Sequence, residues 1–278
     1  MFLLKQILPA VIIAVMVAAG WCGIAVLWKK ESARVPLESL GIGTGYFVGH
    51  LFVTGWMVFP PKDTTNWLPF FAAAIAIVSG FCRVLALRTS LRLLFLFLIS
   101  ALALRLLLKP RFEYGWLPSE GYVWISLLAA TVVLVAVILE SVASVSVRPI
   151  ELPLLLLILS AGCFAVLILS GSMLLSQFAA VLGGAVFGIL ALTAGKINPG
   201  LGTIPVFALL LIALLVSGCS FAELPASCAI LIALAPAMAL LPVAKLSLPV
   251  VPVRALLVSV PILVALFLAF HSSPPLSY

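Results

Sequence analysis

Residues 153 to 170 read PLLLLILSAGCFAVLILS and contain no charged side chain. Because an α-helix rises about 1.5 Å per residue, a helix of this length would be about 27 Å long, close to the roughly 30 Å hydrocarbon core of a bilayer. The stretch is continuously apolar rather than alternating, which favours a helix over a strand of a membrane β-barrel. It therefore predicts a transmembrane helix.

The composition of the whole chain agrees with this interpretation. Of the 278 residues, 65% are hydrophobic and 8% are charged, whereas a soluble domain carries about 25% charged residues. The net charge of +7 comes from lysines and arginines spread over short connections between apolar runs, and no basic block of the kind that binds phosphates is present. We expect the lipid bilayer, and no nucleic acid, as a partner.

Nine further segments have the same apolar character as residues 153–170. The ten predicted spans are 7–28, 39–59, 67–86, 91–108, 121–139, 153–170, 174–194, 203–219, 225–243 and 250–270. The longest polar connections, 109–120 and 140–151, are too short to form a domain. We therefore predict an all-α integral membrane protein: one transmembrane domain over 1–278, a polytopic bundle of about ten helices with no soluble domain.

Basic residues predict the orientation, because cytoplasmic connections carry an excess of lysine and arginine. If the N-terminus is outside, the inner side would receive Lys29, Lys30, Arg34, Arg83, Arg88, Arg92, Arg148, Lys196, Lys245 and Arg254. The outer side would receive Lys5, Lys62, Arg105, Lys109 and Arg111. We therefore predict a multi-pass protein of the cell membrane or bacterial inner membrane, with both termini on the non-cytoplasmic side. Arg83, Arg88 and Arg92 are expected to extend towards anionic headgroups.

Ten helices divide into halves 1–140 and 141–278, and a repeat of five helices must insert in inverted orientation relative to its twin. A G-x-x-x-G pattern at Gly45 and Gly49 has a counterpart at Gly184 and Gly188, which is the basis for a hypothesis of inverted duplication. The length and the five-plus-five plan resemble the drug/metabolite transporter superfamily. No motif matches residue by residue, and the predicted outside termini depart from that superfamily's usual pattern, so we assign no family.

Glycines recur every four residues in the second predicted helix, at Gly41, Gly45 and Gly49, and therefore share one face. Such a face lets a neighbouring helix approach to backbone contact. The alternative interpretation is functional: the bare face would admit a ligand or let the helix slide or bend. Gly184 and Gly188 would form the corresponding face of the seventh helix.

Tyr46, His50 and Thr54 form a polar stripe beside that glycine face, because their spacing of four places them on one side of a helix. His50 falls about ten residues from either end of the predicted span 39–59, and ionisable groups at such depth usually face a bundle interior. One interpretation is a neutral histidine that hydrogen-bonds to Tyr46, Thr54 or a neighbouring carbonyl. The others are a proton-sensitive or ligand-contacting group and a haem ligand.

Gln177 is an amide inside an apolar run, which suits either a hydrogen bond between helices or a contact with a substrate. The five cysteines lie in or beside apolar runs with no C-x-x-C pair, a pattern typical of core packing rather than of a disulfide or zinc framework. We expect no metal and no cofactor.

No H-E-x-x-H, G-x-S-x-G or P-loop motif is present, so we do not expect an enzyme. Two functions remain. One is a transporter or permease-like protein that moves a small neutral or lipophilic molecule through a cavity between the halves, with Tyr46, His50, Thr54 and Gln177 as its polar groups. The alternative is a non-catalytic, membrane-embedded structural or accessory subunit of a larger complex, whose partners would be other membrane subunits or further copies of the chain.

Overall fold

The computed structural model describes residues 2–27, 31–57, 59–61, 63–146, 148–193, 202–242 and 250–272, which form helices and no strand. The elements are α1 (Phe2–Leu27), α2 (Glu31–Thr54), the 3-10 turn η1 (Thr64–Trp67), α3 (Leu68–Val84), α4 (Thr89–Leu107), α5 (Lys109–Tyr114), α6 (Pro118–Val145), α7 (Glu151–Leu169), α8 (Met173–Thr193), α9 (Thr203–Phe221), α10 (Ala226–Leu234), η2 (Ala235–Leu240) and α11 (Val250–Ser272).

Eight of these helical segments are long and apolar enough to cross a membrane: α1, η1 with α3, α4, α6, α7, α8, α9 and α11. The chain is therefore a multi-pass helical membrane protein.

Each of the ten predicted spans lies on a helix, but α2 and the α10–η2 segment do not meet this criterion. The first half of α2 contains Glu31 and Glu38, and α10 gives way to the 3-10 turn η2 at Ala235 and Pro236, where proline cannot donate a helix hydrogen bond. Pro261 lies inside the continuous helix α11.

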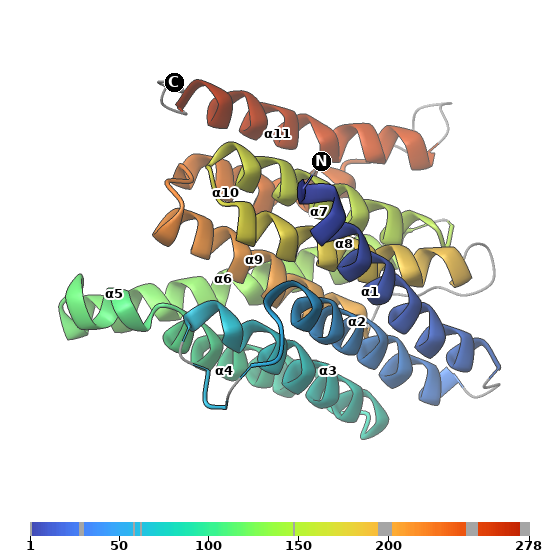
Figure 1. Cartoon of the computed structure of the whole chain (residues 1–278). Helices are drawn as coiled ribbons and strands as arrows, with labels where there is room; N and C mark the ends of the chain where they lie inside the picture. Colours follow the sequence, from blue (N-terminus) through green and yellow to red (C-terminus); the bar gives the residue numbers. More distant parts are fainter. Residues whose placement is uncertain are drawn as a thin grey trace.

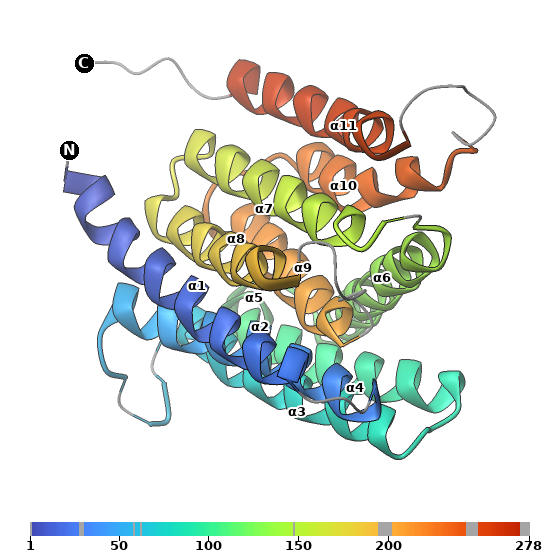
Figure 2. The ribbon, with the colours of Figure 1, turned by 90° about the vertical axis from the view of Figure 1, so that its right-hand side faces the viewer.

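Helix α9 lies in the middle of the bundle, and α2, α3, α6, α7 and α8 all pack against it (Figures 1 and 2). Most of its side chains are buried, from Thr203 to Gly218. Its sequence, TIPVFALLLIALLVSGCSF, is apolar on every side and carries no charge, as expected of a helix that is surrounded by others.

Several ion pairs lie together at one end of the bundle, which we call the charged end. It holds the end of α3, the start of α4, the end of α6 and the starts of α7 and α11, at the right in Figure 1. Arg254 of α11 donates to the Glu151 carboxylate of α7 over 2.6 Å and to the Val145 carbonyl over 3.1 Å. Both side chains of this ion pair are buried, so it fixes α11 against α7.

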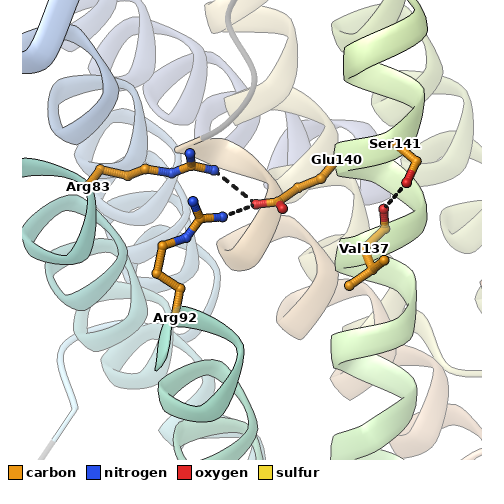
Figure 3. Close-up of polar contacts among 5 residues, drawn as sticks. All are labelled: Arg83, Arg92, Val137, Glu140 and Ser141. Atoms are coloured by element: carbon orange, nitrogen blue, oxygen red, sulfur yellow. Dashed lines mark hydrogen bonds and ion pairs between the residues drawn. The ribbon is translucent and has the colours of Figure 1, made fainter. Parts of the chain in front are cut away.

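Of the three arginines that were expected to extend towards headgroups, two also bind a carboxylate of the protein. Arg83 of α3 and Arg92 of α4 both bind the Glu140 carboxylate of α6 (Figure 3). The reason is that α4 packs along α6, which places a carboxylate within reach of both guanidinium groups. Arg88, in the connection between α3 and α4, is exposed as expected.

The opposite end, which we call the aromatic end, holds α5, the loop after α2 and the connection to α6 (Figure 1). Its basic residues have local partners: Arg105 lies 5.6 Å from the ring centroid of Tyr122, and Arg111 donates to the Ser220 carbonyl at the end of α9 over 3.0 Å. The basic residues predicted for the two membrane sides thus lie at opposite ends of the bundle. Lys29, Lys30, Lys62, Lys196 and Lys245 fall outside the described residues.

The two halves do not pack in the same way. Helix α11 packs along α7, whereas α6, which would be its counterpart in the first half, is not extensively packed on α1 in the described part of the chain. The contacts between α1 and α2 and between α7 and α8 are extensive in both halves. The fourth and fifth helices of each half, α4 with α6 and α10–η2 with α11, also pack together, so the two halves share part of their arrangement.

Candidate functional site: the seam between the halves

Helix α1 packs against α2 and α8 through faces made of small residues. We call this three-helix contact the seam. The glycines of α2 lie over α1 in antiparallel register. A Cβ added at Gly41, Gly45 or Gly49 would meet the carbonyl oxygen of Ala18, Ala14 or Ala10 at 3.3, 3.0 and 3.1 Å, respectively. The glycine face that the sequence indicates is therefore a place of backbone contact between helices.

The glycines of α8 approach an adjacent face of α1, and both helices contact Ala18. A Cβ at Gly184 would lie 3.0 Å from the Val11 carbonyl oxygen, and one at Gly188 would lie 2.5 Å from that of Val15. Helices α2 and α8 also meet directly, because a Cβ at Gly49 would lie 2.5 Å from Val181. Both G-x-x-x-G patterns thus converge on α1, where the first half of the chain meets the second.

The partner face on α1 was not identified from the sequence. Ala10, Ala14, Ala18 and Cys22 recur every four residues and are fully buried. A search for any small residue at this spacing, rather than for glycine alone, would have found the stripe. Gly43 was also missed: it faces α3, where an added Cβ would lie 2.5 Å from Ala76.

Tyr46 and His50 lie at the seam, and both side chains are fully buried. The His50 ring stacks on Phe178 of α8 with centroids 3.9 Å apart and an interplanar angle of 14°. The Tyr46 ring is tilted against it at 5.7 Å. The predicted position of His50 about ten residues from either helix end was wrong, because α2 ends at Thr54 rather than near residue 59. Gly55 stops the helix with a positive φ of 79°, a conformation that glycine adopts without strain.

The histidine is not held by the hydrogen bonds that the simplest interpretation requires. The two ring nitrogens of His50 have no hydrogen-bond partner among the described residues, and the same is true of the Tyr46 hydroxyl. Thr54 donates to the His50 main-chain carbonyl over 3.0 Å, not to the ring. The Asn66 side chain comes near the imidazole without reaching hydrogen-bond geometry. The seam therefore contains three buried polar atoms with unused hydrogen-bonding capacity.

Gln177, the remaining predicted polar residue, lies in the second turn of α8 and is 6% exposed. It directly precedes Phe178, on which His50 stacks. Tyr46 and His50 therefore lie in the seam, Thr54 lies one turn further along α2, and Gln177 lies on α8 beside Phe178 in the chain.

An apolar cavity of about 280 Å³ borders the seam between α1, α7 and α8; it is a groove open on one side and not an enclosed void. Its walls are Val11 and Val15 of α1, Leu157, Ser160, Ala161 and Phe164 of α7, and Ala179, Ala180, Gly183, Gly184 and Phe187 of α8. The hydroxyl of Ser160 is already bonded to the Leu156 carbonyl at 2.9 Å, so the lining offers almost no free polar group. Gly184 belongs both to this wall and to the contact with α1.

The described residues include no group of three or more His, Cys, Asp or Glu side chains that could hold a metal ion. All five cysteines are free thiols, four of them buried, in agreement with packing rather than a disulfide framework.

No protein-family model, curated protein or solved structure matches the chain.

Proposed function

We propose that the chain is a permease-like transporter for small neutral or lipophilic molecules, which pass along the seam between its halves. The observation that supports this proposal best is the apolar cavity, because one wall comes from α1 in the first half and the others from α7 and α8 in the second. Its volume of about 280 Å³ is close to the roughly 300 Å³ lower limit of ordinary small-molecule pockets.

The polar groups of the seam would serve as contacts for such a molecule. The Tyr46 hydroxyl and the two ring nitrogens of His50 have no partner among the described residues. A buried polar group without a hydrogen bond costs about 1–3 kcal/mol, and a passing substrate with a donor and an acceptor would recover part of this cost. Phe178, stacked on His50, would present an aromatic surface to the same molecule.

The number and orientation of the membrane crossings are part of this proposal. We propose that α2 and α10–η2 complete a set of ten crossings, five in each half, in an inverted arrangement. The charged end would face the cytoplasm, in accord with the positive-inside rule. Both termini would then be on the non-cytoplasmic side, and the aromatic end would lie at the outer headgroup level.

The test is a gentle purification of the protein from its own cells, followed by native mass spectrometry of both protein chains and small molecules. The transporter proposal predicts a single kind of chain that carries a bound neutral molecule, and uptake of that molecule into proteoliposomes. His50→Ala should reduce uptake at least tenfold while the protein stays monodisperse. Stoichiometric partner chains and no bound molecule would contradict the transporter proposal and support the accessory-subunit alternative.

A further inference from the structure

The Arg83–Glu140–Arg92 cluster at the charged end joins three helices through one oxygen atom. Arg83 Nη2 lies 3.0 Å from Glu140 Oε1, and Arg92 Nη2 lies 2.7 Å from the same oxygen (Figure 3). The three side chains are only 16–21% exposed. A single carboxylate therefore faces two guanidinium groups, and the cluster carries one positive charge in excess.

The guanidinium groups also have unused donors. Each has five N–H bonds, and each makes one hydrogen bond within the described part of the protein. None of the remaining donors is a fully buried atom without a partner, so a group outside the protein can reach them. Strong pairing of arginine with an oxyanion is bidentate, and neither arginine achieves this with Glu140.

The cluster lines a cleft between α3, α4 and α6, whose other lining residues are mostly apolar and include Cys82, Leu96, Ile99 and Ala136. The free volume of about 30 Å³ has room for only about two or three water molecules, so a larger anion would bind at the mouth of the cleft rather than inside. Large apolar side chains beside the mouth are exposed, among them Phe81, Leu85, Leu94 and Leu98, which places the cleft on the lipid-facing surface.

We propose that this cleft binds the phosphate of an anionic phospholipid. Arg83 and Arg92 would donate their free N–H groups to the phosphate oxygens beside Glu140, and the acyl chains would lie along the exposed apolar residues of α3 and α4. Arg83 is the penultimate residue of α3 and Arg92 lies in the first turn of α4, so both are at the depth of headgroups. The exposed Arg88 between them adds a third positive charge at the same level.

The experiment titrates the purified, delipidated protein with phosphatidylglycerol and counts bound lipids by native mass spectrometry, with zwitterionic phosphatidylcholine as the reference lipid. Arg92→Gln removes the excess charge and should weaken phosphatidylglycerol binding about tenfold, the usual effect of one charge-assisted contact. Glu140→Gln removes the competing carboxylate and should strengthen it at least threefold. Arg105→Gln, on the same helix at the opposite end, is the matched control and should leave binding unchanged.

Several results would overturn the proposal. They are equal binding by the Arg92→Gln and Arg105→Gln variants, weaker binding by Glu140→Gln, or equal binding of the two lipids. Displacement of phosphatidylglycerol by millimolar inorganic phosphate would show a site for free anions instead of a lipid site. If Arg92→Gln fails to run as a single gel-filtration peak, Glu140→Gln still decides the question, because the proposal predicts a gain and a purely structural ion pair predicts none.

Discussion

Tyr46 and His50 have an arrangement that stability alone does not favour. Both are fully buried, and three of their polar atoms have no partner among the described residues. A protein that needed only a packed seam would gain stability from apolar residues at these positions. His50 stacks on Phe178 of α8 and Tyr46 lies against His50, where the halves meet, and this position is the reason that we give them a role in binding.

At the residue scale, Tyr46→Phe tests this interpretation. The substitution removes a buried hydroxyl without changing the shape of the ring. The free energy of unfolding should therefore stay the same or rise by at most about 1 kcal/mol, and the unfolding temperature in detergent should follow it. Uptake of the bound molecule should fall. Tyr114→Phe, at a residue that is 88% exposed, is the control and should change neither. A loss of more than about 1 kcal/mol would show that the hydroxyl has a stabilising partner.

The sequence predicted which residues share the polar face, because a spacing of four is enough for that. It did not predict that Thr54 bonds to the main chain or that the imidazole lies one turn from the end of α2. The first depends on a rotamer, which spacing does not determine. The second depends on Gly55, whose positive φ ends the helix inside a run that remains apolar as far as Phe59.

At the scale of elements, the seam is a three-helix contact in which α1, α2 and α8 each pack against the other two. The glycine pattern indicated contact faces on α2 and α8, but the shared partner had to come from the structure, because alanine is common in every membrane helix. The binding of Arg83 and Arg92 to Glu140 was missed for a similar reason: the sequence shows that they are near a membrane surface, not that a carboxylate of α6 is within reach.

Gly188→Ala tests the closeness of this contact. An added Cβ would lie 2.5 Å from the Val15 carbonyl oxygen and 3.1 Å from Ala18, so α1 and α8 must move apart and stability should fall by about 1–3 kcal/mol. The measurement is thermal unfolding in a mild detergent.

Gly20→Ala is the matched control for this prediction. It makes the same change in α1 at a position where the new Cβ meets nothing within 4 Å. It should be neutral or slightly stabilising, because alanine favours a helix over glycine by about 1 kcal/mol. Equal effects of the two substitutions would contradict a close α1–α8 contact.

At the scale of the whole molecule, the helical segments and the separation of charges could be predicted from hydropathy and charge, since both follow from the thickness of the bilayer. The central position of α9 could not. Its uniformly apolar sequence would suit lipid as well as protein on every side. The cavity was equally beyond prediction, because it depends on how α1, α7 and α8 diverge.

The orientation can be tested by cysteine labelling in a variant without the native cysteines. Arg148→Cys lies in an exposed connection near the charged end, and Glu113→Cys lies on α5 at the aromatic end. In intact cells, a membrane-impermeant maleimide should label the cysteine at position 113 and should reach the one at position 148 only after permeabilisation. The reverse pattern would place the charged end outside.

The central claim is that the cavity between α1 and α7–α8 receives a small neutral molecule, and the most direct measurement uses indole as the probe. An apolar cavity of this size takes up small apolar molecules, and binding to the folded state raises the unfolding temperature. Millimolar indole should stabilise the unmodified protein and the Ala130→Phe variant, whose new side chain is on the exposed face of α6. It should not stabilise Ala180→Phe, which fills the cavity. An equal shift in all three proteins, or none in the unmodified protein, would contradict the account.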